Sequence, residues 1–227
     1  MTKVVVLTGA GISAESGLPT FSGADGLWEG HRRQDVATPD GFVADPVTVQ
    51  RFYNRLRRRL HEVEPNAAHH ALARLQHHLG PRMRLVTQNI DDLHQRACTV
   101  ELTAMHGELR KIRHVDTGQV LDWSHDVVET DTQWRPHVVW FGEPLPDGAW
   151  QQSVDAVVSA DLVVVVGTSS VVYPAAGLPE LAVANGTPVI EVNPEPTPLS
   201  ASATVSLREK AATALPGLLQ RLPALLN

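Results

Sequence analysis

Residues 4 to 13, VVVLTGAGIS, place an aliphatic run directly before a glycine-rich turn. An uninterrupted apolar run of this length is typical of a strand buried on both faces, as in a parallel sheet. A glycine turn after such a strand can bring backbone N–H groups close to a phosphate. Gly9, Gly11 and Ala14 fit the G-x-G-x-x-G/A spacing of dinucleotide-binding turns, which lead from a strand into a helix. The segment therefore predicts a dinucleotide site, with a tight turn that binds no ligand as the alternative.

The acidic residue that usually accompanies this motif has no clear counterpart. It is expected about 20 positions after the turn, at the end of a second strand, where it binds a ribose. Glu29 and Asp35 stand near that distance, but they lie in a segment without strand character. The turn is therefore not that of an ordinary dehydrogenase.

Further apolar runs at 84–88, 162–167 and 188–193 resemble the first one. Helix-like segments alternate with them at 65–79, 150–160 and 174–185, and the first of these repeats apolar residues at spacings of three and four. Strands that alternate with helices predict an α/β fold, a Rossmann-like parallel sheet with helices on both faces.

Two segments interrupt this alternation, and we assign them to a smaller inserted domain. Residues 24–65 are rich in helix signals, including Asp45 and Pro46 as the N-cap and first position of a helix. Residues 104–144 contain short strand-like pieces about 116–119. The Rossmann-like domain, which would bind the dinucleotide, then comprises 1–23, 66–103 and 145–227.

Composition excludes several classes of protein. The chain has 227 residues and a net charge of −6, which gives no reason to expect nucleic-acid or membrane binding. Cys98 is the only cysteine, so an internal disulfide or a cysteine-rich zinc site is not expected. The first residues do not resemble a signal peptide and no apolar stretch has the length of a membrane span, so we expect a cytoplasmic protein.

Longer blocks give a more specific interpretation. They are GAGISAESGLPTF (9–21), TQNIDDLH (87–94), MHGEL (105–109), PHVVWFGE (136–143), GTSSVVYPAAG (167–177) and VNPEP (192–196). Together they resemble the sirtuins, NAD-dependent protein lysine deacylases, and most of all the bacterial class III, desuccinylase-type group. The resemblance covers nearly the whole chain. It implies a Rossmann-like large domain, a small domain, and a cleft between them for NAD and an acyl-lysine peptide.

The same resemblance assigns the chemistry. His106 would be the general base on a ribose hydroxyl while the acyl group moves to ADP-ribose, a role that suits the pKa of histidine. The alternative for His106 is a structural or surface histidine. Asn89 would hold a water molecule beside it.

The resemblance also implies a set of NAD contacts. An amide and a carboxylate at the carboxyl end of a strand can bind ribose hydroxyls and the nicotinamide amide, although Asp91 could instead cap the next helix. Phe21 would shield the reactive ribose, or be a core aromatic. The full set is Gly9, Ala10, Gly11, Ser13, Glu15, Phe21, Trp28, Gln88, Asn89, Asp91, Gly167, Thr168, Ser169, Asn193, Glu195 and Ala211.

Substrate contacts follow from two blocks. The peptide would pair by strand addition with a segment that could also be an ordinary buried strand, namely Val138, Val139, Phe141, Gly142 and Glu143. Tyr53 matches a tyrosine of the desuccinylase acyl pocket, but Leu56 stands where its arginine is expected. Arg57, one turn after Tyr53, could replace that arginine or belong to a solvated basic helix face. Acetyl and succinyl groups both stay open, with a slight preference for a neutral acyl group.

The chain departs from the family elsewhere. Most sirtuins hold a structural zinc on four cysteines, whereas here His114 stands at the first expected position and the second pair is absent. We predict no zinc, and an apolar cluster in its place formed by Ile112, Val115, Val120, Leu121 and Trp123. A substitute site from His114, Asp116, His125 and Asp131 would match no zinc spacing.

Two further features concern side chains around the site. Ser22 replaces an arginine that supports the NAD loop, a role that Arg32 or Arg33 could take. The histidine pairs at 69–70 and 77–78 are predicted on a solvated helix face.

The leading prediction is an NAD-dependent lysine deacylase, acting on acyl-lysine proteins or peptides, that releases nicotinamide and O-acyl-ADP-ribose. A mono-ADP-ribosyltransferase and a non-catalytic NAD-sensing module are the alternatives. The VVWFGE segment favours deacylation over ADP-ribosyl transfer, because it would pair with a peptide. Protein targets and oligomeric state do not follow from the sequence.

Overall fold

The computed structural model describes residues 2–20 and 27–225. Phe21 and Ser22, to which we assigned roles near NAD, lie outside the described residues. Within those ranges, no helix is long and apolar enough to cross a membrane.

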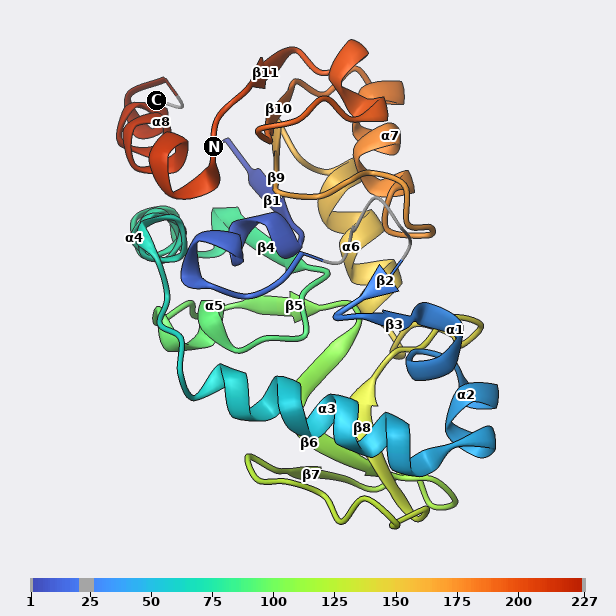
Figure 1. Cartoon of the computed structure of the whole chain (residues 1–227). Coiled ribbons are helices and arrows are strands. Elements are labelled where there is room, and N and C mark those ends of the chain that lie inside the picture. Colours follow the sequence, from blue (N-terminus) through green and yellow to red (C-terminus); the bar gives the residue numbers. More distant parts are fainter. Residues whose placement is uncertain (1, 21–26, 226–227) are drawn as a thin grey trace.

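A six-stranded sheet forms the larger part of the molecule, in the order β11-β10-β9-β1-β4-β5 (Figure 1). Each neighbouring pair of strands is parallel. The four predicted strands are all present, whereas β5 and β11 have three residues each and are too short to give an apolar run. The strands are β1 (Val4–Thr8), β4 (Met83–Thr87), β5 (Leu102–Ala104), β9 (Leu162–Val166), β10 (Val189–Val192) and β11 (Val205–Leu207).

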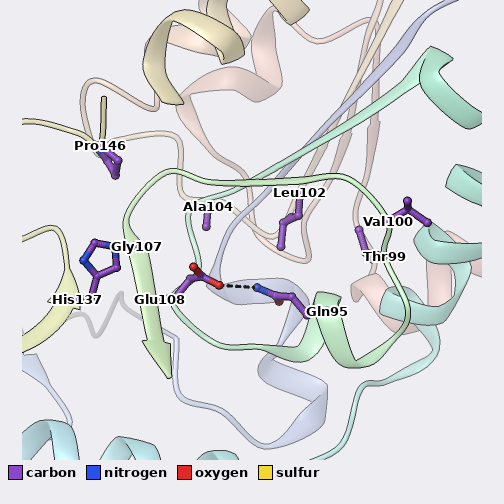
Figure 2. A pocket seen from close by; sticks show the side chains of 9 residues that line it. All are labelled: Gln95, Thr99, Val100, Leu102, Ala104, Gly107, Glu108, His137 and Pro146. Carbon is purple, nitrogen blue, oxygen red and sulfur yellow. Dashed lines mark hydrogen bonds between the residues drawn. The ribbon is translucent and has the colours of Figure 1, made fainter. Parts of the chain in front are cut away.

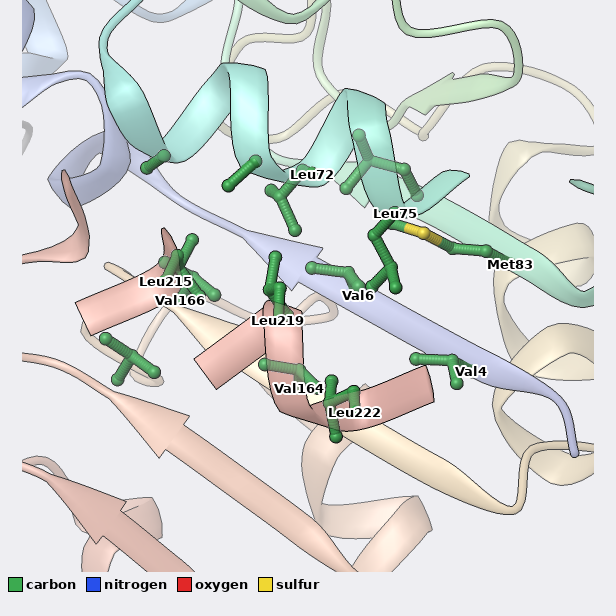
Figure 3. Close-up of a cluster of buried hydrophobic side chains, with 14 of the residues drawn as sticks. Val4, Val6, Leu72, Leu75, Met83, Val164, Val166, Leu215, Leu219 and Leu222 are labelled. Atoms are coloured by element: carbon green, nitrogen blue, oxygen red, sulfur yellow. The ribbon is translucent and has the colours of Figure 1, made fainter. Parts of the chain in front are cut away.

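Helices cover both faces of this sheet, so the predicted α/β class is confirmed (Figure 1). Side chains alternate across a strand. Val4 and Val6 of β1 therefore face α4 (Ala67–Leu79) and α8 (Ala211–Leu225), where they join the cluster in Figure 3. Val5 and Leu7 face the side of α6 (Ala149–Val158) and α7 (Gly177–Ala184). Burial on both faces explains why β1 and β9 are apolar at nearly every position.

A smaller unit contains a three-stranded antiparallel sheet, β7-β6-β8, and three helices. The Asp45 side chain accepts a hydrogen bond from Thr48 N, 3.0 Å away, which confirms the predicted N-cap of α3. Residues 116–119 are the turn between β6 and β7, so the strands flank this segment. The elements are α1 (Arg33–Val36), α2 (Pro39–Ala44), α3 (Pro46–Leu60), β6 (Gly107–His114), β7 (Val120–Asp122) and β8 (Trp134–Val138).

The predicted apolar cluster in this unit does not form. Ile112 is buried, but Val115, Val120 and Leu121 are 42%, 41% and 37% exposed. The reason is that β7 is a three-residue edge strand whose side chains all face solvent. Apolar residues on a short hairpin cannot build a core without a second layer to cover them.

The remaining elements are short connections. They are β2 (Leu27–Trp28), β3 (His31–Arg32), α5 (Leu93–Arg96) and 3-10 turns at Ala10–Ile12, Ala14–Ser16, Gly80–Arg82 and Pro198–Ala201.

Candidate active site

Two glycine turns meet where β1 and β9 end. Gly9 N donates to Val166 O at 3.0 Å, and Gly11 N donates to Gly167 O at 2.8 Å. A Cβ atom on Gly11 would lie 2.6 Å from Gly167 Cα, and Gly167 itself has φ +60°. Both positions therefore need glycine, because any side chain would force the turns apart.

The first turn does not lead into an α-helix, contrary to the prediction from its spacing. It continues as the 3-10 turns Ala10–Ile12 and Ala14–Ser16, which bring Ser13 back over the strand ends. The Glu15 carboxylate accepts a hydrogen bond from Ala212 N, 2.7 Å away, at the start of α8. The Glu15 carboxylate thus caps the first turn of α8, the turn that also contains Ala211.

Ser13, Asn89 and Asp91 come together beside this turn. The Ser13 hydroxyl donates to Asp91 Oδ2 at 2.9 Å and accepts from Asn89 Nδ2 at 3.2 Å. Leu93 N donates to the other carboxylate oxygen at 3.1 Å, so Asp91 also binds the first N–H group of α5, whose N-cap is Asp92. Burial raises the pKa of Asp91 to about 6, although the bonds from Leu93 and Ser13 lower it. Asp91 is therefore a carboxylate held at an energetic cost.

Two buried histidines lie beneath these residues, and the sequence analysis missed both. His69 Nδ1 accepts from Asn66 N at 3.2 Å, so the ring proton is on Nε2, 3.4 Å from Ser13 Oγ. His94 Nε2 lies 3.0 Å from Thr8 Oγ1. Burial lowers the pKa of His69 to about 4 and that of His94 to about 3, so both rings are neutral.

The predicted solvated position is therefore wrong for His69, although His77 and His78 are exposed. Asn66 followed three residues later by His69 forms a capping box, and this spacing could have revealed the buried ring.

His106 stands directly before β6. Its Nδ1 lies 2.8 Å from Gln88 O, and a carbonyl oxygen can only accept. The Nδ1 atom therefore carries the proton, and Nε2 of the neutral ring is left with a lone pair. Burial lowers the pKa of His106, so the neutral form predominates near pH 7. This arrangement gives His106 the tautomer of a general base that acts through Nε2.

Hydrogen bonds also join the ends of β4, β9 and β10. Gln88 Nε2 donates to Thr168 Oγ1 at 3.1 Å, and Asn193 Nδ2 donates to Thr168 O at 2.9 Å. Glu195 is exposed, and its N–H donates to Asn193 Oδ1 at 3.3 Å. The half-buried residues Ala10 and Ser169 lie in the two turns. The structure thus gathers most predicted NAD contacts at the carboxyl edge of the sheet, where ligands of such folds bind.

The predicted peptide segment follows β8. Val139 N donates to His106 O at 2.8 Å, which fixes this segment against the histidine. Phe141 is 42% exposed, and Gly142 has φ +87°. The Glu143 carboxylate accepts from Trp140 N at 2.8 Å and pairs with Arg135 at 2.5 Å. The Arg135 guanidinium stacks 3.3 Å from the centre of the Trp140 ring, so the turn is held from both sides.

Tyr53, Arg57 and Trp28 lie in the core of the smaller unit. The Tyr53 hydroxyl accepts from Trp140 Nε1 at 2.8 Å, and Trp28 packs edge-on near Tyr53. Arg57 is 1% exposed, with Nε on Leu109 O at 3.1 Å and Nη1 on Asn54 Oδ1 at 2.9 Å. The solvated-face alternative for Arg57 is therefore wrong.

Comparisons with known proteins agree with this geometry. The Sir2 family model matches residues 9–174. The chain belongs to the Sir2 family. It is 52% identical to the NAD-dependent protein deacylase Sir2 of Mycolicibacterium smegmatis, over 99% of this chain and 98% of that protein. It is 47% identical to an NAD-dependent protein deacylase of Mycobacterium tuberculosis, over 99% and 100%.

Solved structures of Sir2 homologues have the same fold. A Sir2 homologue in complex with NAD is 39% identical, with a TM-score of 0.90 over 99% of this chain and 91% of that one. A mutant Sir2 homologue in complex with ADP-ribose is 38% identical, with a TM-score of 0.91 over 99% and 93%.

The region of the family's zinc site has other contacts in this Sir2 chain. His114 Nδ1 accepts from Asp116 N at 3.3 Å, and Asp131 Oδ1 accepts from Gln133 N at 2.8 Å. Across residues 2–20 and 27–225, no group of three or more His, Cys, Asp or Glu side chains could hold a metal ion. That this Sir2 protein folds without zinc remains a prediction.

A hollow of about 370 Å³ lies between β5, the start of β6 and the end of β8 (Figure 2). It is lined by residues such as Gln95, Leu102, Glu108 and His137. Gln95 Nε2 donates to the Glu108 carboxylate at 3.3 Å, and Lys111 pairs with the same carboxylate. None of the predicted site residues lines this hollow, so we assign it no part in the reaction.

Proposed function

We propose that this chain is an NAD-dependent protein lysine deacylase in which His106 Nε2 is the general base. The observation that carries the proposal is the 2.8 Å contact between His106 Nδ1 and Gln88 O. It fixes the tautomer and presents Nε2 beside the strand ends that carry Asn89 and Asp91. Deacylases of the same family, at 52% and 47% identity over the full chain, support the activity.

The residues present fit NAD. Gly9 and Gly11 let the two glycine turns pack closely and leave the first turn without side chains, since a Cβ at either position would meet Gly167 or Thr168 within 2.9 Å. Such a surface allows a pyrophosphate to approach the backbone. Gln88, Asn89 and Asp91 would hold the nicotinamide ribose end, and Asn193 and Glu195 the adenosine end. NAD, when bound, supplies the ADP-ribosyl group that accepts the acyl chain, with nicotinamide as the leaving group.

His106 takes the proton of a ribose hydroxyl at Nε2. As that proton arrives, the Nδ1–H bond to Gln88 O strengthens, because the ring becomes positively charged. General bases in such positions contribute a rate factor of about 10² to 10⁴. The backbone of Val139, bonded to His106 O, connects the histidine to the segment that we propose for the peptide. A peptide added as a strand along residues 138–143 would therefore lie next to the base.

The buried position of Arg57 supports a neutral acyl group. A succinyl carboxylate would have to leave water and enter the core to reach the guanidinium, at a high desolvation cost. Arg57 Nη2 is a buried donor without a hydrogen-bond partner among the described residues. This atom is the donor that a succinyl carboxylate would reach, so acetyl- and succinyl-lysine peptides compared side by side test the preference for a neutral acyl group.

The test incubates the protein with NAD and peptides that carry acetyl-, succinyl- or longer acyl-lysine. Mass spectrometry measures acyl loss, nicotinamide and O-acyl-ADP-ribose. We expect NAD-dependent acyl loss that falls at least about 100-fold in His106→Ala. His78→Ala changes an exposed histidine on the last turn of α4, before the amino end of β4, and is the matched control that should retain full activity.

Equal rates for His106→Ala and the wild type would refute the role of His106. ADP-ribose attached to protein without acyl loss would favour the mono-ADP-ribosyltransferase. NAD binding without nicotinamide release would favour the sensing module.

A further inference from the structure

Glu191 is a buried carboxylate that the proposed reaction does not use. It lies on β10, is 1% exposed, and accepts from Ser200 Oγ at 2.7 Å, Ser206 Oγ at 3.0 Å and the Thr197 hydroxyl. Arg208 Nη1 donates to it at 2.9 Å. Burial alone would raise the pKa of Glu191, but these hydrogen bonds lower it below its ordinary value. The carboxylate is therefore ionised and fully engaged by protein donors.

Arg208 connects this carboxylate to the loop after β10. The same Nη1 atom lies 3.4 Å from Asn193 O and 3.4 Å from Glu195 O. The Asn193 side chain in turn donates to Thr168 O, and Thr168 Oγ1 accepts from Gln88. A continuous path of hydrogen bonds thus runs from Glu191 to the glycine turn of β9 and the end of β4.

We propose that Glu191 and Arg208 are positioning residues that hold residues 193–195 in the conformation that binds the adenosine end of NAD. The inference rests on the proposed function, in which Asn193 and Glu195 contact NAD. Acidic residues at strand ends of dinucleotide-binding folds often bind a ribose directly. Glu191 does not have that role, because four protein donors surround its carboxylate. It acts through Arg208 on the loop backbone.

This arrangement has a specific kinetic consequence. Loosening residues 193–195 weakens binding of NAD and ADP-ribose, since both contain the adenosine end. The kcat and the KM for the acyl-peptide stay unchanged, because His106 and residues 138–143 have no contact with Arg208. A general loss of structure would instead lower kcat and the melting temperature.

The first experiment measures ADP-ribose binding by calorimetry, and steady-state rates, for Arg208→Ala and Arg208→Lys. Loss of the contacts should raise the Kd for ADP-ribose and the KM for NAD by about tenfold in Arg208→Ala. One nitrogen makes all three contacts, so the lysine ammonium of Arg208→Lys should restore most of the affinity. Lys210→Ala removes a positive charge two residues away and is the matched control, with affinity expected to be unchanged.

The second experiment uses Glu191→Gln, alone and combined with Arg208→Ala. We expect the same rise in the ADP-ribose Kd as for Arg208→Ala, and no further rise in the double variant, because both act through one contact. An unchanged Kd in Arg208→Ala, an equal loss in Lys210→Ala, or additive losses in the double variant would overturn the proposal.

Binding of ADP-ribose does not depend on turnover, so this test is separate from that of the deacylase. A wild type that binds ADP-ribose but removes no acyl group would refute the proposed function and leave the positioning role measurable. A wild type that fails to bind ADP-ribose would overturn both.

Discussion

Asp91→Asn should stabilise the fold while it removes activity. Burial raises the pKa of this carboxyl from 3.8 to about 6, which means that the ionised form is disfavoured in the folded protein. A pKa difference of roughly 2 corresponds to about 3 kcal/mol. Two effects reduce this figure: asparagine loses one of the hydrogen bonds from Ser13 and Leu93, and solvent screens part of the penalty because Asp91 is only half-buried. We therefore expect the free energy of unfolding to rise by a net amount of about 1 to 2 kcal/mol.

The gain depends on pH in a defined direction. Between pH 3.8 and about 6 the folded state holds more protons on Asp91 than the unfolded state does, so the wild type loses stability as the pH rises through this window. Above pH 6 the penalty is complete. The advantage of Asp91→Asn should therefore be largest near pH 8 and disappear toward pH 4.

Urea denaturation at pH 4, 6 and 8 measures this difference, and the melting temperature at pH 8 should rise by roughly 3 to 6 °C. The control is Asp147→Asn, because Asp147 is exposed and belongs to no part of the proposed site. This substitution should change the free energy of unfolding by less than about 0.5 kcal/mol. A variant that is no more stable than the wild type at pH 8 would refute the reasoning, since Asp91 would then carry no ionisation penalty.

Three further predictions concern positions around the site. Gly107→Ala should lower the free energy of unfolding by more than about 2 kcal/mol in urea titrations, because its Cβ would lie 2.2 Å from His137 O at φ +79°. His94→Gln should flatten the loss of stability as pH falls from 6.5 toward 3, since the unfolded state alone protonates this histidine there; the pH dependence of urea midpoints measures it. Arg135→Lys cannot keep both bonds to Glu143, so the KM for the acyl-peptide should rise severalfold in steady-state assays while the KM for NAD stays unchanged.

Local sequence patterns predicted much of the larger unit. The apolar runs at β1, β4, β9 and β10 identified every central strand, because a strand buried on both faces is apolar at most positions, although β10 also carries Glu191. The edge strands β5 and β11 escaped, since three residues carry no period. The apolar residues about Val120 were misplaced for a related reason. Burial depends on whether another layer covers the hairpin, and none of the described residues covers it there.

For the site, the sequence by itself determined the residues that stand next to strand ends. Gly11, Asn89 and His106 lie at or beside the carboxyl edge because the blocks that contain them begin or follow a strand. Only the tertiary structure decided the contacts between distant segments. The pairing of Ser13 with His69, the enclosure of Glu191 by Arg208 and the burial of Arg57 under Leu109 each join residues 15 or more positions apart. A polar side chain has the same local pattern whether it is solvated or buried, and the packing of the surrounding elements alone determines which partners it meets.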